Sequence, residues 1–189
     1  MIELILNKEV IVNKVLCRIF GVLVFVILTS LSAFVRIPLP FTPVPITLQT
    51  LFVLLSGAFL GSNLGAITQL SYLLLGLSGL PIFTAGGSGV LYLFGPTGGY
   101  LFGFVFASFL IGRFIKSRHR SLLSVFALFC LADLVLLLSG VIWLKFLLGY
   151  NLVKSLFIGF LPFIPGDLLK ICIATGIYIR LESRLKDVF

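Results

Sequence analysis

Long runs of apolar residues, separated by short polar or proline- and glycine-rich breaks, dominate this chain. A helix that crosses a bilayer needs about 20 such residues, because the hydrocarbon core is about 30 Å thick. The 189-residue chain therefore has room for roughly five to seven crossings. The runs predict six helices, over residues 17–35, 46–60, 64–77, 100–115, 122–147 and 165–181. This pattern predicts an all-α membrane protein, a six-transmembrane-helix bundle in a single domain over residues 1–189.

Two of the breaks are rich in proline or glycine and carry no charge. Residues 37–45 hold four prolines, which forbid a continuous helix. Residues 78–99 are rich in glycine, and no Asp, Glu, Lys, Arg or His occurs from Ile37 to Gly112. Irregular backbone at membrane depth must lie against protein or line a water-filled cavity. We expect both connections to fold over the bundle as re-entrant or lid-like outer loops.

The composition agrees with a chain that lies in lipid. It is 60% hydrophobic and only 11% charged, whereas soluble domains are about 45–50% apolar and about 25% charged. A soluble fold cannot bury that much apolar surface. The length leaves no room for a separate soluble domain, so an ATP-hydrolysing domain is not expected on this chain.

The net charge of +8 suits a membrane protein whose basic residues gather in cytoplasmic loops. If the N-terminus is cytoplasmic and six helices cross, ten basic residues lie on the cytoplasmic side: Lys8, Lys14, Arg18, Arg113, Lys116, Arg118, Arg120, Arg180, Arg184 and Lys186. Four lie on the outer side or at its membrane boundary: Arg36, Lys145, Lys154 and Lys170. The bias predicts a multi-pass protein of the cell membrane with both termini cytoplasmic and the irregular connections outside.

The start of the last predicted helix, residues 162–170 (PFIPGDLLK), holds the first candidate for chemistry. Pro165 suits a first helical turn, and Asp167 and Lys170 share one helix face because they are three residues apart. Ionisable residues at membrane depth are costly and usually face a cavity or a partner. The two side chains are therefore either a ligand-binding acceptor and donor or a plain intrahelical ion pair, and spacing alone leaves both open.

Asp133 is the second candidate, about midway along the fifth predicted helix. An uncompensated Asp at that depth costs a few kcal/mol at least. We expect it to face the bundle interior and pair with a polar side chain, or to be protonated. No surrounding motif identifies its partner or its role.

Signatures of enzymes and metal sites are missing from the sequence. His119 is the single histidine and lies in a basic loop, which argues against a His-based triad or metal site. The three cysteines have no metal-ligand or redox spacing. The glycine-rich residues 86–99 match no phosphate-binding motif, although glycines let backbone amides approach a small ligand. No cofactor and no enzymatic activity are expected.

Four segments together resemble one known family, the BioY family, which comprises the biotin-specific S components of energy-coupling factor (ECF) transporters. They are residues 37–50 (IPLPFTPVPITLQT), 76–87 (GLSGLPIFTAGG), 95–100 (GPTGGY) and 165–170 (PGDLLK). They occur in family order and at family-like spacing. The resemblance implies biotin uptake, with the binding cavity near the outer face under the first loop. It also implies a complex with a transmembrane coupling subunit and two cytoplasmic ATPases, and it assigns Asp167 and Lys170 to ligand binding.

For biotin itself, a carboxylate can accept hydrogen bonds from the N–H groups of the flat ureido ring, and an ammonium can donate one to its carbonyl. The thioether ring and valerate chain need apolar walls with few placed polar groups. Wall candidates are Phe41, Tyr72, Leu80 and Phe83. Candidates to meet the valerate carboxylate are Tyr72, Thr84 and the backbone amides of Gly86 and Gly87.

One feature departs from the family pattern. First helices of the family often carry Ala-xxx-Ala spacing for packing on the coupling subunit, since small residues let helices approach closely. Here Thr29-xxx-Ala33 is the clear remnant. The sequence therefore does not identify the contact between the first helix and the coupling subunit.

Two alternatives are kept. Within transport, the chain could be a solitary biotin facilitator that needs no ATPase partner. In a different class, it could be an intramembrane enzyme acting on a lipid, with Asp133 or Asp167 as acid or base.

Overall fold

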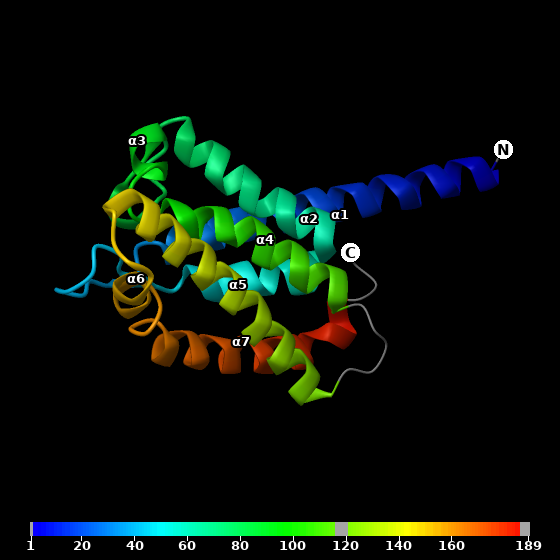
Figure 1. The fold of residues 1–189 in the computed structure, drawn as a ribbon. Helices are drawn as coiled ribbons and strands as arrows, with labels where there is room; N and C mark the ends of the chain where they lie inside the picture. The colour runs from blue at the N-terminus through cyan, green and yellow to red at the C-terminus, as the bar shows by residue number, and fades with distance from the viewer. Residues whose placement is uncertain (1, 116–120, 186–189) are drawn as a thin grey trace.

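The computed structural model describes residues 2–115 and 121–185, with side chains described from 14 to 115 and from 121 to 182. Its elements in order are α1 (Ile2–Ser32), β1 (Arg36–Ile37), β2 (Ile46–Thr47), α2 (Gln49–Leu77), a 3₁₀ turn η1 (Thr84–Gly86), α3 (Gly89–Leu93), α4 (Gly98–Phe114), α5 (Leu122–Leu148), α6 (Leu152–Gly159) and α7 (Ile164–Leu185). The long helices run side by side as a bundle (Figure 1). Each of the six predicted helices has a helical counterpart, so the helical class is confirmed.

The α2 helix is a hairpin of two arms rather than one rod. It breaks at Gly61, whose φ of 81° and ψ of −179° are non-helical and essentially restricted to glycine. The chain then folds back beside itself (Figure 1), and the arms touch where Gln69 Nε2 donates to Ser56 Oγ at 2.9 Å. The two arms correspond to the second and third predicted helices. The predicted start at residue 46 is corrected, because Ile46 and Thr47 form strand β2.

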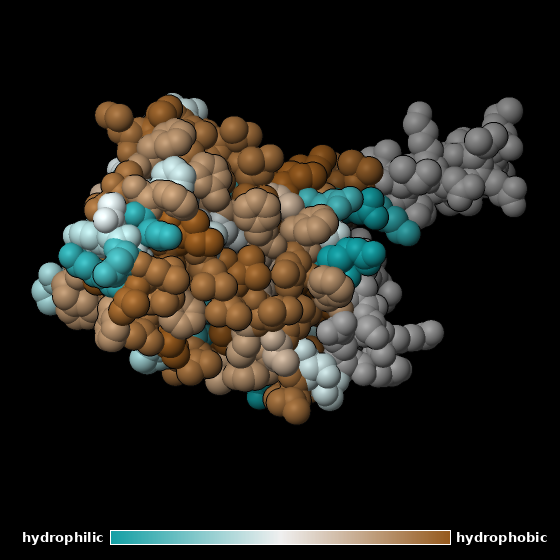
Figure 2. Space-filling view, in the orientation of Figure 1, coloured by the Kyte–Doolittle hydropathy of each residue, from teal (hydrophilic) through white to brown (hydrophobic). Residues whose placement is uncertain are grey.

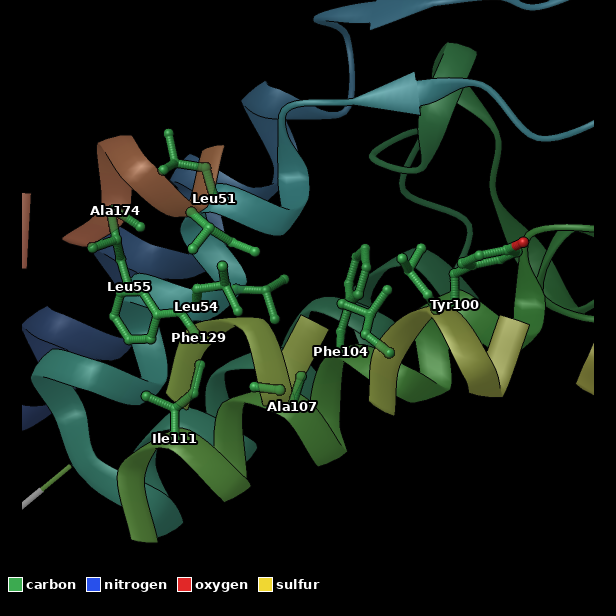
Figure 3. Packing of buried hydrophobic residues seen from close by; sticks show 14 of the residues in the cluster. Leu51, Leu54, Leu55, Tyr100, Phe104, Ala107, Ile111, Phe129 and Ala174 are labelled. Atoms are coloured by element: carbon green, nitrogen blue, oxygen red, sulfur yellow. The ribbon is translucent and has the colours of Figure 1, made fainter. Parts of the chain in front are cut away.

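Glycines at the contact allow α4 to pack closely against this hairpin. A side chain at Gly57 would collide with the Ser108 carbonyl, and one at Gly112 with the backbone of the Gly61 turn. The apolar core fills the space between α2, α4, α5 and α7 (Figure 3). Its labelled members are Leu51, Leu54, Leu55, Tyr100, Phe104, Ala107, Ile111, Phe129 and Ala174.

The surface agrees with a membrane protein. Figure 2 shows a broad apolar band between hydrophilic groups at the two ends of the bundle. By length and composition, three described segments could cross a membrane: Lys14–Ser32, Gln49–Leu77 and Leu122–Leu148. A fourth is possible if α6 and α7, which are bent by 52° relative to each other, form one span. The six-crossing count stays a prediction.

The three irregular connections gather at one end of the bundle, opposite to the end where α1 begins and α7 ends (Figure 1). The first is a two-stranded antiparallel ribbon, in which Arg36 pairs with Thr47 and Ile37 with Ile46. The second holds η1 and α3, and the third holds α6. The predicted basic positions Lys116, Arg118, His119, Arg120 and Lys186 lie outside the described residues, as do the side chains of Lys8 and Arg184.

Candidate functional site

A pocket opens between the helices at the end that carries the three connections. Its apolar wall consists of Val44, Pro45, Leu101, Phe104, Leu136, Leu137 and Phe163. Its polar groups come from Thr47, Gln49, Thr50, Thr84, Thr97, Tyr100, Asp167 and Lys170. Predominantly apolar walls with a few convergent polar groups are typical of a site for a small organic molecule.

An ion pair between Asp167 and Lys170 forms the charged part of this pocket. The two residues begin α7, which places the carboxylate in the first turn, where the helix dipole favours negative charge. Both are buried, with 3% and 5% of their surfaces exposed. A buried pair of this kind is stable only when further hydrogen bonds satisfy it.

Those further bonds come from the end of β2 and the start of α2. Lys170 Nζ donates to the Thr47 carbonyl oxygen at 2.9 Å and to Thr50 Oγ1 at 2.6 Å. Thr50 in turn donates to Asp167 Oδ1 at 3.3 Å. The other carboxylate oxygen, Asp167 Oδ2, is buried and has no hydrogen-bond partner among the residues that the structure describes. The site therefore holds an acceptor that is ready for a donor, since a buried polar atom without a partner is costly.

A second polar network joins the pocket to the connection between α2 and α4. Gln49 Nε2 donates to the Tyr72 hydroxyl at 2.7 Å, and Tyr72 donates to the Ile82 carbonyl at 3.2 Å. Gln49 Oε1 accepts from Thr84 at 3.2 Å and from Thr47 at 3.3 Å. Through these bonds, Gln49 links both arms of the α2 hairpin to the loop that supplies Thr84.

Comparison with known proteins decides the family. The sequence profile of the BioY family matches residues 8–187, nearly the whole chain. The chain belongs to the BioY family. The earlier resemblance, which rested on segments between residues 36 and 170, is thereby confirmed.

Similar BioY relatives and one solved structure cover almost the same length. The chain is 40% identical over 162 residues to a probable biotin transporter BioY from Pyrococcus horikoshii, covering 86% of this chain and 94% of the relative. It is 37% identical over 164 residues to a biotin transporter BioY from Thermotoga maritima, covering 85% and 92%. The crystal structure of the S-component for biotin from an ECF-type ABC transporter superposes with a TM-score of 0.82 at 32% identity, covering 94% of this chain and 93% of that one.

Three of the site residues proposed from the sequence lie in the pocket wall. Asp167, Lys170 and Thr84 all line it, although they come from α7 and from a loop about 80 residues earlier in the chain. The Thr84 hydroxyl donates to Gln49. Whether each contacts a ligand stays a prediction.

The other expected residues lie outside the lining. Tyr72 and Phe83 are fully buried, and their rings meet edge-on with the centroids 5.5 Å apart. The ring of Phe83 also stacks on that of Tyr92, with the centroids 5.2 Å apart. Phe41 and Leu80 are 60% and 46% exposed.

Gly86 and Gly87 are not among the residues that line the pocket, and they close a tight turn. The Gly86 amide donates to the Phe83 carbonyl at 3.0 Å, and the Phe83 amide donates to the Gly87 carbonyl at 3.0 Å. Gly87 packs against the ring of Tyr92. These contacts shape the loop that presents Thr84.

Five polar pocket residues were not singled out from the sequence: Thr47, Gln49, Thr50, Thr97 and Tyr100. A signal for three of them existed, because TLQT at residues 47–50 is a polar cluster inside an uncharged, apolar stretch. Tyr100 gave no such signal. Its hydroxyl donates to the Gly159 carbonyl at 2.6 Å, so that it ties α4 to the end of α6.

Asp133 lies inside the bundle, as expected, with 5% of its surface exposed. On α5 it is one helical turn before Leu136 and Leu137, which line the pocket. Its charge interacts with those of Asp167 and Lys170, and its Oδ1 has no hydrogen-bond partner among the described residues. Asp133 is therefore a second buried carboxylate, coupled electrostatically to the ion pair in the pocket.

Proposed function

We propose that this protein is the biotin-binding S component of an ECF-type vitamin uptake system, and that biotin occupies the pocket at the looped end of the bundle. Membership of the BioY family supports this function, together with relatives named biotin transporter BioY. One structural observation carries the assignment to this pocket. It is an Asp167 carboxylate with a buried, unpartnered oxygen, set in a largely apolar cavity.

Biotin matches this pocket in chemistry. The N–H groups of its ureido ring supply the donor that Asp167 Oδ2 lacks. A hydrogen bond to a charged group contributes about 1.5–3 kcal/mol. The thioether ring and valerate chain suit a wall built from Leu101, Phe104 and Leu136, since burial of apolar surface drives most small-molecule binding.

The membrane arrangement follows from charge and from the position of the pocket. We infer that both termini are cytoplasmic, that the six helical segments cross the cell membrane and that the looped end faces outward. The bias of basic residues supports this orientation. Biotin would then enter from outside beneath the ribbon formed by β1 and β2.

Release to the cytoplasm requires energy or a gradient, and the chain has no ATP-binding motif. We propose that a transmembrane coupling subunit with cytoplasmic ATPases drives release. The likeness to an S-component of an ECF-type ABC transporter supports such partners. The Thr29-xxx-Ala33 spacing is not available to them, because both residues are fully buried within this chain. A coupling subunit would meet the exposed face of α1 instead, which includes Phe20, Leu23 and Ile27.

The solitary facilitator remains the second candidate. Cells that lack biotin synthesis would distinguish the two, by comparing growth on low biotin with and without co-expressed coupling subunits. Growth with this chain alone favours the facilitator. Growth only with the coupling subunits favours the S component. The enzyme alternative is set aside, because the family is one of transporters.

The direct test is a titration of the purified protein with biotin, thiamine and riboflavin. Trp143 is the single tryptophan, and its indole donates to the Gly95 carbonyl at 2.8 Å, beside the start of α4. Its fluorescence is therefore a suitable readout, with calorimetry as an independent one. Saturable binding of biotin alone supports the proposal. Absence of biotin binding, or equal binding of the other vitamins, contradicts it.

A further inference from the structure

The Lys170 ammonium has no donor to spare for a ligand. An ammonium carries three N–H donors. One is used by Asp167 in the ion pair, one by the Thr47 carbonyl and one by Thr50 Oγ1. Lys170 therefore holds Asp167 and the start of α2 together, and it reaches the ligand only through Asp167.

Within the described ranges 14–115 and 121–182, no buried cation other than Lys170 lines the pocket. Among the described residues that line it, Asp167 and Lys170 alone are charged, and they neutralise each other. The sequence from Ile37 to Gly112, which supplies most of the remaining wall, contains no basic residue at all. A carboxylate placed deep in this pocket would lose its hydration without gaining a counter-charge, which is strongly unfavourable.

A basic residue does pair with the pocket-lining Thr47 across the ribbon, but it is exposed. Arg36 is directly opposite Thr47 in the β1–β2 ribbon, so that the two side chains leave the same face of the ribbon. Arg36 is exposed, and exposed ion pairs contribute little to binding because water screens them. Arg36 can therefore attract an anionic ligand without binding it much more tightly than a neutral one.

We propose that the pocket recognises the ureido end of biotin and leaves the valerate carboxylate at the rim without a buried counter-charge, so that biotin amides and esters bind about as well as the free acid. This inference rests on the proposed function, because it assumes that biotin is the ligand. It widens the substrate class to biotin derivatives whose carboxyl group is neutral. It also makes Lys170 a positioning residue and Asp167 Oδ2 the acceptor for a ureido N–H.

The test is a competition series on the purified wild-type protein. The ligands are biotin, biotinamide, biotin methyl ester and the N-butyl amide of biotin. A biotin methylated on its ureido nitrogen serves as the control for the opposite end. We expect the three neutral-tail ligands to bind within about tenfold of biotin, whereas the N-methylated ligand loses more than about tenfold.

Each outcome of the competition series either supports or contradicts the inference. Neutral-tail ligands that bind more than about tenfold more weakly than biotin would overturn the inference, because the acid would then have a strong partner. An N-methylated ligand that binds as well as biotin would overturn the assignment of the ureido end. If biotin itself does not bind, the proposed function fails, which is a different result from either of these.

Two variants identify the partner if the inference fails. In Lys170→Met and in Arg36→Gln, the affinity ratio of biotin to biotinamide should stay within about threefold of the wild-type ratio. If Lys170 had a merely structural role, Lys170→Met would lower stability and would also leave this ratio unchanged. The affinity for each ligand is therefore measured as well, because only a positioning role lowers it in folded protein. As a positioning residue, Lys170 predicts equal losses for acid and amide. A selective loss of the acid in either variant would show that its side chain pairs with the carboxylate, against the proposal.

Discussion

Thr50 and Lys170, which are 120 residues apart in sequence, are joined by a hydrogen bond of 2.6 Å between the first arm of α2 and the start of α7. This bond closes the charged end of the pocket. Thr50 also donates to Asp167, so that one hydroxyl accepts from the cation and donates to the anion. The ion pair is thereby held in one geometry rather than left as a mobile pair on a helix surface.

The first prediction concerns the acceptor. Asp167→Asn should weaken biotin binding about tenfold or more, which corresponds to about 1.5–3 kcal/mol for a hydrogen bond to a charged group. Asn keeps the shape and one acceptor oxygen, so the loss reports mainly on charge. Biotin titration of the folded variant measures it, with thermal stability recorded alongside. Wild-type affinity in a well-folded Asp167→Asn protein would remove Asp167 from the site.

The second prediction concerns the ion pair. Lys170→Met should lower the free energy of unfolding by about 3–5 kcal/mol, because it leaves the Asp167 carboxylate buried without its counter-charge. Adding Asp167→Asn to Lys170→Met should restore part of that stability, since the free-energy changes caused by substitutions of contacting residues do not add. Thermal unfolding in detergent compares the variants. The buried-pair account is wrong if the double variant is less stable than Lys170→Met.

The third prediction concerns the hairpin turn of α2. Gly61→Ala should destabilise the protein by about 1–3 kcal/mol, because φ of 81° with ψ of −179° is a region that residues with a Cβ avoid. The matched control is Gly176→Ala in α7, where an added Cβ meets nothing within 4 Å. That change should be neutral or slightly stabilising, because alanine is the better helix former. Equal melting temperatures for the two variants would contradict the glycine-restricted backbone conformation at Gly61.

The fourth prediction separates two residues of the first connection. Val44 lines the pocket and is 5% exposed, whereas Phe41 is 60% exposed. Val44→Ala should weaken biotin binding by about 1–2 kcal/mol, because it removes two buried methyl groups. Phe41→Ala should have a much smaller effect on affinity. The reverse order in a biotin titration would restore the sequence-based assignment of Phe41 to the wall.

The fifth prediction concerns orientation. In a variant without native cysteines, a cysteine at Phe41 should react with an impermeant maleimide in intact cells. A cysteine at Leu122, at the opposite end of the bundle and also exposed, should react only after the membrane is opened. Labelling of residue 122 from outside would reverse the proposed topology. The assay needs no ligand, so it tests the membrane arrangement independently of biotin.

The sequence by itself determined the helices and their environment. Apolar runs of membrane-spanning length and a nearly charge-free stretch are local properties, and each of the six segments they predict contains a helix in the structure, although the second begins with strand β2. The i,i+3 spacing likewise determined that Asp167 and Lys170 share a face and can pair.

Only the tertiary structure decided what surrounds those residues. Whether Asp167 and Lys170 face lipid, a neighbour or a cavity depends on the α2 segment that packs against α7, and no local pattern encodes this choice. Phe41 and Phe83 illustrate the same limit. Both follow glycine- or proline-rich sequence, yet one is 60% exposed and the other is fully buried. Burial of a side chain depends on contacts from distant parts of the chain, and these form only when the helices pack.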